Sequence, residues 1–277
     1  MSFKELGLSD PVLRSLKDLE HSEPSEIQTQ AIPIVLEGKN IMAAAQTGTG
    51  KTGSFVLPMI ELLQEQAKPY SKHVHALILT PTRELAAQVR ESVYTYGKYT
   101  SITSTAVFGL AKIFPKKSKL KKGLDILVAT PGRLLDLVNQ KAVKLDKVQI
   151  LVLDEADHML DMGFIHDIKK IIGMTPSERQ NLLFSATFSP EIKKLAQSLG
   201  SDLVEIAAQS PNTTVNAITQ VVYHVDKDKK SALLSHLIES EQWPQALVFS
   251  RTKHGSEKIA KQLNADGIQT ATIHGDK

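Results

Sequence analysis

AQTGTGKT (residues 45–52) ends in Gly-Lys-Thr, as phosphate-binding loops of the pattern G-x-x-x-x-G-K-S/T do, but Ala45 stands where that pattern opens with glycine. The stretch follows an apolar strand candidate, NIMAAA (40–45), and opens a helix candidate over 51–66. In that context the backbone N–H groups of the loop and of the helix amino end would surround phosphate groups. A chance glycine-rich turn is the alternative, and the order of strand, loop and helix favours the phosphate loop.

Each part of this loop has a predicted role. Gly48 and Gly50 would let the backbone approach the phosphates closely. Lys51 would reach the β- and γ-phosphates, and the hydroxyl of Thr52 would bind Mg²⁺. Alanine at position 45 adds only a methyl group, so it weakens the pattern match more than the chemistry. The predicted nucleotide-binding loop consists of Gln46, Thr47, Gly48, Thr49, Gly50, Lys51 and Thr52.

Short apolar segments alternate with amphipathic helical segments, a pattern typical of βαβ units with a parallel sheet. The apolar runs are nearly continuous, as expected of strands that helices cover on both faces. Ligands of such a doubly wound α/β sheet are expected beyond the carboxyl ends of its strands. Strands are predicted at 40–45, 74–80, 102–108, 124–130, 148–154 and 180–186, and helices at 51–66, 83–97, 131–139 and 188–199.

A run of small and polar residues, AAQSPNTTVNA (207–217), interrupts this pattern and indicates a linker. A second, shorter α/β pattern follows, and because three strands enclose little core, it looks unfinished. We therefore expect one α/β domain over 1–207, a linker over 208–217 and an incomplete α/β domain over 218–277. In the last of these, strands are predicted at 219–225, 245–250 and 270–273, and helices near 229–239 and 254–265.

The bulk composition excludes several classes of protein. Lys and Arg number 33 against 30 Asp and Glu, a formal net charge of +3, so any nucleic-acid-binding surface must be local. The chain has no cysteine, which excludes disulfides and cysteine-ligated metals. No apolar run approaches the roughly 20 residues that span a bilayer, and the amino terminus lacks the features of a signal peptide. We therefore expect a cytoplasmic protein.

Two carboxylates, Asp154 and Glu155, directly follow the apolar strand candidate ILVL (150–153). Asp154 suits the coordination shell of a magnesium ion, and Glu155 would orient and activate an attacking water. Exposed acids at a helix amino end, stabilised by the helix dipole, are the alternative. The phosphate loop upstream favours nucleotide hydrolysis, with Lys51, Asp154 and Glu155 as its catalytic groups.

An ordered series of motifs resembles the DEAD-box ATP-dependent RNA helicases, and among them the bacterial RhlE type. The series covers essentially the whole chain, and an ordered series of this length is not expected by chance. The resemblance implies two RecA-like domains, ATP and Mg²⁺ as cofactors, and RNA as the partner. The motifs are Phe3 with PSEIQ (24–28), AQTGTGKT (45–52), PTRELA (81–86), TPGR (130–133), DEAD (154–157), SAT (185–187), ALVFSRTKHG (246–255) and IHGDK (273–277).

In this family an upstream aromatic residue and a glutamine select adenine. The resemblance thus implies that Phe3 stacks on the base and that Gln28 bonds its N6 and N7 edge. A Gln amide carries the donor and the acceptor that such a contact needs. Ser25 stands where threonine is common and retains the hydroxyl. Without the resemblance, Phe3 would be a hydrophobic anchor and Gln28 a residue of a helix surface.

The resemblance further implies that loops at strand ends contact RNA sugars and phosphates. Hydroxyl, backbone N–H and guanidinium groups are ordinary phosphate partners. Taken alone, PTRELA and TPGR would be interpreted as helix caps and turns. A hydrogen bond to Asp157 from the loop that carries Ser185 and Thr187 would couple the ATP site to the RNA face. The implied RNA-binding residues are Thr82, Arg83, Gly109, Thr130, Gly132 and Arg133.

Two local features leave alternatives open. Leu110 replaces a glycine that is usual in the family, and a lysine run follows it. That run is either a nonspecific phosphate-binding patch or a solvated surface. His73 and His75 share one strand face, where a metal pair is one interpretation and strand-edge histidines, favoured for lack of a third ligand, the other. The run comprises Lys116, Lys117, Lys119, Lys121 and Lys122.

Motifs with which the family completes its second domain, including arginines that reach the γ-phosphate, do not occur in these residues. We therefore expect the chain to bind ATP but to hydrolyse it poorly and not to unwind RNA, with loose order beyond 218. A fragment, a natural truncation and a damaged gene all predict this sequence. Three functions stay open: an RNA-stimulated ATPase that separates short duplexes, an ATP-gated RNA-binding module without turnover, and a DNA-directed or protein-remodelling ATPase.

Overall fold

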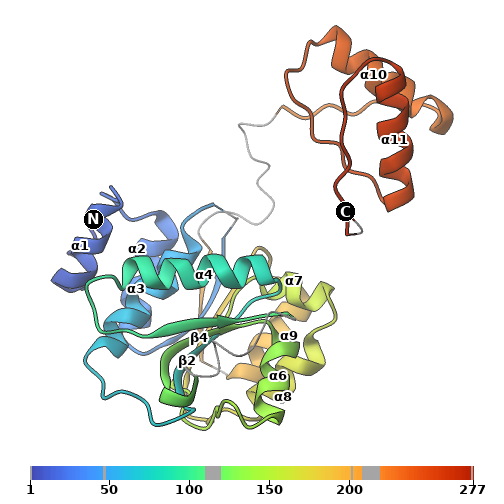
Figure 1. Cartoon of the computed structure of the whole chain (residues 1–277). Helices are drawn as coiled ribbons and strands as arrows, with labels where there is room; N and C mark the ends of the chain where they lie inside the picture. Colours follow the sequence, from blue (N-terminus) through green and yellow to red (C-terminus); the bar gives the residue numbers. More distant parts are fainter. Residues whose placement is uncertain (1, 46–47, 110–119, 201, 208–218, 276) are drawn as a thin grey trace. The chain divides into compact units, whose positions relative to one another are not determined.

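The computed structural model describes residues 2–45, 48–109, 120–200, 202–207, 219–275 and 277 (Figure 1). By its internal contacts the chain divides into two units, Met1–Thr213 and Thr214–Lys277. The predicted linker, Gln46, Thr47 and most of the lysine run lie outside the described residues. The two units are therefore described separately below.

Among the described residues of unit 1, one parallel sheet has the strand order β3-β4-β2-β5-β6-β1-β7. Its first six strands lie within the segments predicted from their apolar runs, so the predicted doubly wound parallel sheet is confirmed. The seventh strand, β7, was not predicted, and it pairs only with β1. The strands are β1 (Asn40–Ala44), β2 (Val74–Leu79), β3 (Ser104–Val107), β4 (Leu124–Ala129), β5 (Ile150–Leu153), β6 (Gln180–Ser185) and β7 (Leu203–Ala207).

Helices cover both faces of this sheet, as Figure 1 shows for α4 on one side and for α6, α8 and α9 on the other. Successive strand residues point to opposite faces, so Ile78 packs in the apolar cluster of α1–α4 and Leu79 in that of α6–α9. The helices are α1 (Asp10–Asp18), α2 (Glu26–Leu36), α3 (Lys51–Gln64), α4 (Arg83–Tyr96), α6 (Pro131–Asn139), α7 (Ala156–Asp161), α8 (Ile165–Ile172) and α9 (Pro190–Leu199).

The parallel arrangement gives unit 1 two chemically different ends. The loops after β1 to β6 all leave from the carboxyl ends of their strands. These loops and the helix starts that follow them carry the residues predicted to bind ATP and RNA, apart from Phe3 and Gln28, which precede β1. The turns that enter β2, β4 and β5 lie at the opposite, amino end of the sheet. The topology therefore brings the predicted site residues to one end, as expected for ligands of such sheets.

The described residues of unit 2 form the helices α10 (Lys230–Ser240) and α11 (Lys253–Ala265), preceded by a short 3-10 turn at Lys227–Lys229. Both helices were predicted. The three strands predicted at 219–225, 245–250 and 270–273 are wrong for the described residues, because no β-ladder joins these segments. An apolar run becomes a strand only where a neighbouring strand pairs with it. Apolar side chains of these segments are instead exposed, Phe249 by 87% and Ile273 by 91%.

Candidate functional site

The loop after β1 enters α3 through two glycines with left-handed backbone. Gly48 has a φ of 82°, and Gly50, the N-cap of α3, has a φ of 89°. Residues with a Cβ atom rarely adopt these angles. At Gly50 a Cβ atom would also lie 2.7 Å from Ser25 Oγ and 2.8 Å from Gln28 Nε2. Glycine is therefore required at position 50 for two reasons, the left-handed backbone angle and the lack of room for a Cβ atom. Thr49, which lies between the two glycines, is half-buried.

Lys51, the first residue of α3, is only 8% exposed, and its buried Nζ has no hydrogen-bond partner among the described residues. A buried ammonium group without a partner costs free energy unless an anion lies against it. The neighbouring Thr52 is half-buried in the first turn of α3, where backbone N–H groups lack partners within the helix. This arrangement fits a bound phosphate group.

Asp154 follows β5 and is 3% exposed, and its N–H donates to the carbonyl oxygen of Leu79 at 2.9 Å. Burial raises the pKa of Asp154 from 3.8 to about 6, and the positive charge of Lys51 opposes this rise. A carboxylate oxygen is the kind of ligand that Mg²⁺ prefers. Asp154, together with the hydroxyl of Thr52, therefore fits a magnesium ion beside the phosphates.

Glu155 has φ and ψ angles of 52° and 53°, a left-handed conformation at the N-cap of α7. This conformation costs a residue with a Cβ atom roughly 1–2 kcal/mol. The Glu155 side chain is 25% exposed and its Oε2 lies 3.5 Å from Nδ1 of His158. Strained residues of this kind gather at functional sites. The sequence shows the pair of acids but not the strain.

The side chain of Gln28 connects α2 to the phosphate loop. Its Oε1 accepts the N–H of Ser25 at 2.9 Å, and its Nε2 donates to the carbonyl oxygen of Gly50 at 3.1 Å. Gln28 is 8% exposed, so the helix-surface interpretation is wrong. A Cβ atom on Gly53 would lie 2.5 Å from Nε2 of Gln28. Gly53 is thus a site residue that the sequence analysis missed, although glycine in the first turn of a helix is a detectable signal.

Phe3 is 5% exposed and belongs to the apolar cluster of α1–α4. Its packing agrees with the interpretation as a hydrophobic anchor. The stacking of Phe3 on adenine stays a prediction.

Arg83 and Gly109, which follow different strands, lie side by side. Arg83 is exposed at the start of α4, and its guanidinium carbon lies 5.9 Å from the centroid of the Phe108 ring. A Cβ atom on Gly109 would lie 2.9 Å from Cδ and Nε of Arg83. Thr82 is the N-cap of α4, where its hydroxyl oxygen accepts the N–H of Leu85 at 3.2 Å. The structure therefore places three of the predicted RNA contacts at the start of α4.

The other three predicted RNA contacts lie in the first turn of α6. Thr130 is the N-cap and makes no capping hydrogen bond with its side chain. A Cβ atom on Gly132 would make only an ordinary contact, 3.8 Å from Oδ2 of Asp167. The side chain of Arg133 is only 13% exposed and lies 3.6 Å from the carboxylate of Asp136. The guanidinium has five N–H donors, so this single contact leaves others for a phosphate group.

Asp157 joins the loop after β5 to the loop after β6. Its Oδ2 accepts the N–H of Ala186 at 3.0 Å. The predicted bond from this loop is present, but its donor is the backbone of Ala186, not a side chain of Ser185 or Thr187. Ser185 is the last residue of β6 and fully buried, and its Oγ accepts the N–H of Thr187 at 3.4 Å.

A parallel α/β sheet with a phosphate loop, a buried lysine and a buried aspartate defines a P-loop nucleotide-binding protein. The family model for the DEAD/DEAH box helicase matches residues 25–195, so the chain belongs to this family. It is 43% identical over 276 residues to the ATP-dependent RNA helicase CshA of Limosilactobacillus reuteri, a match that covers 100% of this chain and 55% of the relative. It is 37% identical over 275 residues to the DEAD-box ATP-dependent RNA helicase RhpA of Helicobacter pylori (strain B128), a match that covers 99% of this chain and 55% of the relative. The chain thus spans about half the length of these relatives.

Two of the solved structures that resemble this chain align with all of it. One is a DEAD box protein from the hyperthermophile Methanococcus jannaschii, with a TM-score of 0.71 and 37% identity, of which 74% is covered. The other is Dbp5 of S. cerevisiae bound to RNA and ADP BeF3, with a TM-score of 0.82 and 32% identity, of which 70% is covered. The RecA-like fold implied by the sequence is therefore confirmed for unit 1. In the part of the chain that the structure describes, no helix is long and apolar enough to cross a membrane.

Proposed function

We propose that the protein is an ATP-dependent RNA helicase, which binds ATP with Mg²⁺ and the RNA backbone and couples ATP hydrolysis to local separation of RNA strands. The observation that carries this proposal is the buried Nζ of Lys51, which has no hydrogen-bond partner among the described residues and lies close enough to Asp154 to influence its pKa. Support also comes from the names of the relatives and from the neighbour solved with RNA and ADP BeF3. The motif series supports placing the protein with the RhlE type.

Each site residue has a definite task in this reaction. Lys51 would hold the β- and γ-phosphates, with the first-turn N–H groups of α3 around them. Bound Mg²⁺ would neutralise charge on the phosphate oxygens, and Asp154 and Thr52 would hold it. Glu155 would orient the attacking water and accept its proton. Gln28 would bond adenine while it keeps α2 attached to the loop.

Coupling to RNA would run along the sheet end. Asp157 lies two residues after Glu155 and holds the N–H of Ala186. A shift of the loop after β6 on RNA binding would pull on Asp157 and so on the backbone that positions Glu155. This hydrogen bond supports the assignment of Asp157 to the coupling of the two sites, and Ser185 and Thr187, assigned to the same role, flank its donor Ala186.

For residues 1–277 tested by themselves, we propose nucleotide binding with weak turnover and no unwinding. The unpaired apolar segments of unit 2 support this, because closure of two domains over RNA needs a second folded sheet. An arginine finger, which the family takes from its second domain, contributes roughly 10³–10⁵ in rate. The unpaired apolar segments of unit 2 also favour an ATP-gated RNA-binding module as the second candidate function.

ATPase assays with no nucleic acid, with RNA and with DNA test the proposal. They should use residues 1–277 beside a longer protein that contains a complete second domain. Turnover by the longer protein that only RNA stimulates would support the helicase. ATP-dependent RNA binding without turnover in either protein would favour the binding module, and equal stimulation by DNA would contradict RNA as the partner. Equal unwinding by both proteins would contradict the proposed need for a second domain.

A further inference from the structure

Lysines gather at the amino end of the sheet, opposite to the phosphate loop. Two hydrogen bonds show that three chain segments meet there. The N–H of Lys144 donates to the carbonyl oxygen of Lys72 at 2.8 Å, and Oγ of Ser71 donates to the carbonyl oxygen of Lys121 at 2.6 Å. We call this surface the basic edge, and it comprises Lys72, Lys121, Lys122, Lys141, Lys144 and Lys147.

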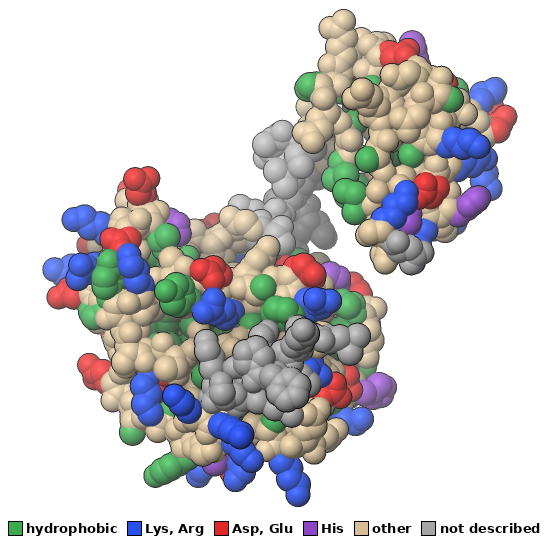
Figure 2. All heavy atoms as spheres, in the orientation of Figure 1, with side chains coloured by type: hydrophobic (Ala, Val, Ile, Leu, Met, Phe, Trp, Pro, Cys, Tyr) green, Lys and Arg blue, Asp and Glu red, His purple; other side chains and the backbone are tan. Residues whose placement is uncertain are grey.

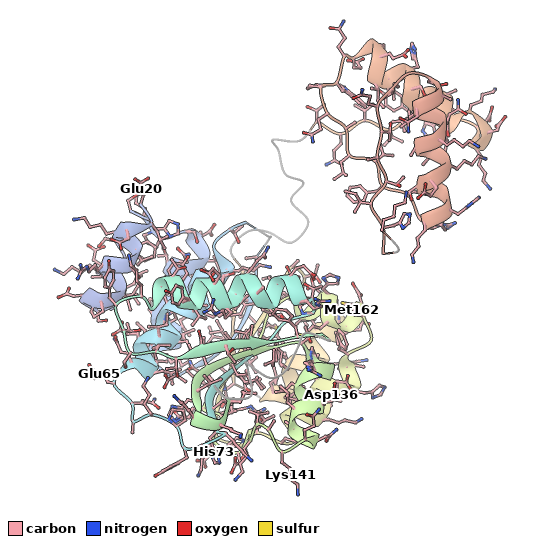
Figure 3. The ribbon with its side chains drawn as sticks, in the orientation of Figure 1. Glu20, Glu65, His73, Asp136, Lys141 and Met162 are labelled. Carbon is pink, nitrogen blue, oxygen red and sulfur yellow. The ribbon has the colours of Figure 1, made fainter. Side chains whose placement is uncertain are left out.

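The charges of the basic edge face solvent. Five of its lysines are exposed and Lys72 is half-buried, and within the described residues none of the six makes an ion pair. Figure 2 shows Lys and Arg side chains along the lower border of unit 1, and Figure 3 places Lys141 and His73 at this end. Lys68 is excluded because its Nζ lies 2.6 Å from the buried Asp125. In a chain with a net charge of only +3, this local excess is the kind of surface that attracts polyanions.

Two of the lysines occupy backbone positions that favour glycine. Lys72 has a φ of 67° and Lys141 a φ of 54°. Lys141 follows the C-cap of α6, where its N–H donates to Val138 at 2.8 Å and the N–H of Ala142 donates to Leu137 at 2.9 Å. This pattern is a Schellman motif, in which the left-handed residue is usually glycine. The chain thus carries positive charge at positions where the fold alone would favour a residue without a side chain.

An exposed aromatic ring adjoins these charges. Tyr70 is 80% exposed, and its ring centroid lies 6.4 Å from that of His73 in an edge-on arrangement. A hollow of about 350 Å³ opens beside it, lined among others by His75, Lys147 and Glu178. Within the described residues no group of three His, Asp or Glu side chains here or elsewhere could hold a metal ion. Because base stacking on an aromatic ring is tolerant of sequence, the basic edge combines the two features of a nucleic-acid-binding surface.

We propose that the basic edge is a second RNA-binding surface, separate from the loops at the carboxyl ends of the strands. The two surfaces lie at opposite ends of β2, which has 6 residues. At about 3.3 Å per residue, the strand separates them by roughly 20 Å. The lysines bind phosphates without regard to sequence, and Tyr70 stacks on an unpaired base. One segment of the RNA binds at the carboxyl ends of the strands, and the basic edge binds the RNA that flanks this segment. The basic edge thereby keeps RNA bound to the protein in the absence of nucleotide. The choice of RNA as the polyanion rests on the proposed function.

The first test compares two double variants of the full chain, Lys144→Gln/Lys147→Gln and the control Lys4→Gln/Lys17→Gln. Both remove two exposed lysines, so both lower the net charge equally. Anisotropy of a labelled RNA hairpin with a single-stranded tail is measured without nucleotide over a range of salt. The Lys144→Gln/Lys147→Gln variant should bind roughly tenfold more weakly near 0.1 M salt, with a salt slope smaller by about 2. Equal effects of both variants would overturn the proposal.

A second pair of variants excludes loss of folding as the cause. Glu20 follows α1 in the same left-handed position as Lys141, with a φ of 57°. Lys141→Gly and Glu20→Gly should each leave the unfolding midpoint unchanged or higher. Only Lys141→Gly should weaken RNA binding, by several-fold. Unchanged RNA affinity of Lys141→Gly and of Lys144→Gln/Lys147→Gln would overturn the basic edge as an RNA-binding surface.

Two further measurements separate this inference from the proposed function. Arg83→Glu should weaken RNA binding at the carboxyl ends of the strands. If Arg83→Glu weakened RNA binding while Lys141→Gly and Lys144→Gln/Lys147→Gln did not, the basic edge would be contradicted as an RNA-binding surface and the proposed function would stand. Binding of poly-aspartate or of vesicles rich in phosphatidylserine, with the same dependence on Lys144 and Lys147, would show a surface for anions in general and would overturn RNA as its partner. Absence of RNA binding by every form of the chain would contradict both proposals.

Discussion

Replacing Gly53 by alanine should weaken ATP binding through the displacement of Gln28. A Cβ atom at position 53 would lie 2.5 Å from Nε2 of Gln28, closer than real contacts allow. Gln28 would have to move, and its hydrogen bonds to Gly50 and Ser25, of 3.1 and 2.9 Å, would be lost. With Gln28 only 8% exposed, the displaced amide reaches little water. The loop would then lose its attachment to α2, and the adenine contact predicted for Gln28 would be lost with it.

Two opposing effects set the change in the free energy of unfolding. Alanine in place of glycine stabilises a helix by about 1 kcal/mol. The two part-buried hydrogen bonds of Gln28 contribute about 0.5–1.5 kcal/mol each. Gly53→Ala should therefore lie between neutral and about 2 kcal/mol destabilising. Gly132→Ala makes the same change in the first turn of α6, where the nearest neighbour lies 3.8 Å from the added atom, so it should stabilise by up to about 1 kcal/mol.

A double-mutant cycle isolates this contact. In a Gln28→Ala background the added methyl group meets no amide, so Gly53→Ala should then stabilise, and the coupling between the two positions should be about 1–3 kcal/mol. Urea unfolding gives the free energies, and titration with a fluorescent ATP analogue gives the affinities. If Gly53→Ala stabilised the protein as Gly132→Ala does and left nucleotide affinity unchanged, the role assigned to Gln28 would be refuted.

Three other predictions rest on single groups. Lys51→Ala should abolish ATP binding in a calorimetric titration while the circular dichroism spectrum stays the same, because Nζ of Lys51 makes no hydrogen bond to the part of the chain that the structure describes. Glu155→Gln should keep ATP affinity but slow turnover of a protein with two complete domains by roughly 10²–10⁴-fold, since the amide cannot accept the proton; near-normal turnover would make Glu155 structural. Hydrogen bonds from Lys98 and then Tyr99 hold the pKa of Asp18 below 3.8, so the stability they contribute is present above that pH and lost as the pH falls below it. Acid titration of Lys98→Ala should therefore show a shallower loss of stability below pH 3.8 than the wild type, and parallel curves would contradict this.

The sequence predicted the central strands well because burial on both faces leaves them almost no polar residues. In β5 all four residues are buried, and the run ILVL marks it at once. Among the described strands, β7 lies at the edge of the sheet beside β1, and its Val204 and Glu205 are exposed, so the apolar run is broken. In unit 2 the apolar signal predicted strands that are not present, since apolar runs such as 245–250 pair with no strand within the described residues 219–275 and 277. Strand prediction from composition therefore depends on a partner that the segment itself does not specify.

The candidate site divides in a similar way. Motifs predicted which residues gather at the carboxyl ends of the strands, because the topology of a parallel sheet determines that end. They did not predict contacts that depend on backbone angles or on side-chain direction. The left-handed Glu155, the donor Ala186 and the close approach of Gly53 to Gln28 belong to this second kind. Each arises where two elements distant in the sequence meet, and one local pattern cannot contain both.

Three unfavourable features of the structure converge on one place, and one ligand would compensate for two of them. Lys51 has a buried ammonium group with no hydrogen-bond partner in residues 48–109 or the other described segments, Asp154 has a carboxylate whose burial raises its pKa, and Glu155 has a strained backbone. Their chain segments follow β1 and β5, with β6 between them in the sheet, so local sequence effects do not explain their proximity.

ATP with Mg²⁺ would pair the charges of Lys51 and Asp154, and at 100 times its dissociation constant it should stabilise the fold by about 2.7 kcal/mol. A thermal shift with ATP and Mg²⁺ that Lys51→Ala eliminates, and that ATP with a chelator only partly reproduces, is the expected result. An equal shift in Lys51→Ala would mean that the nucleotide binds elsewhere and that the buried charges have another cause.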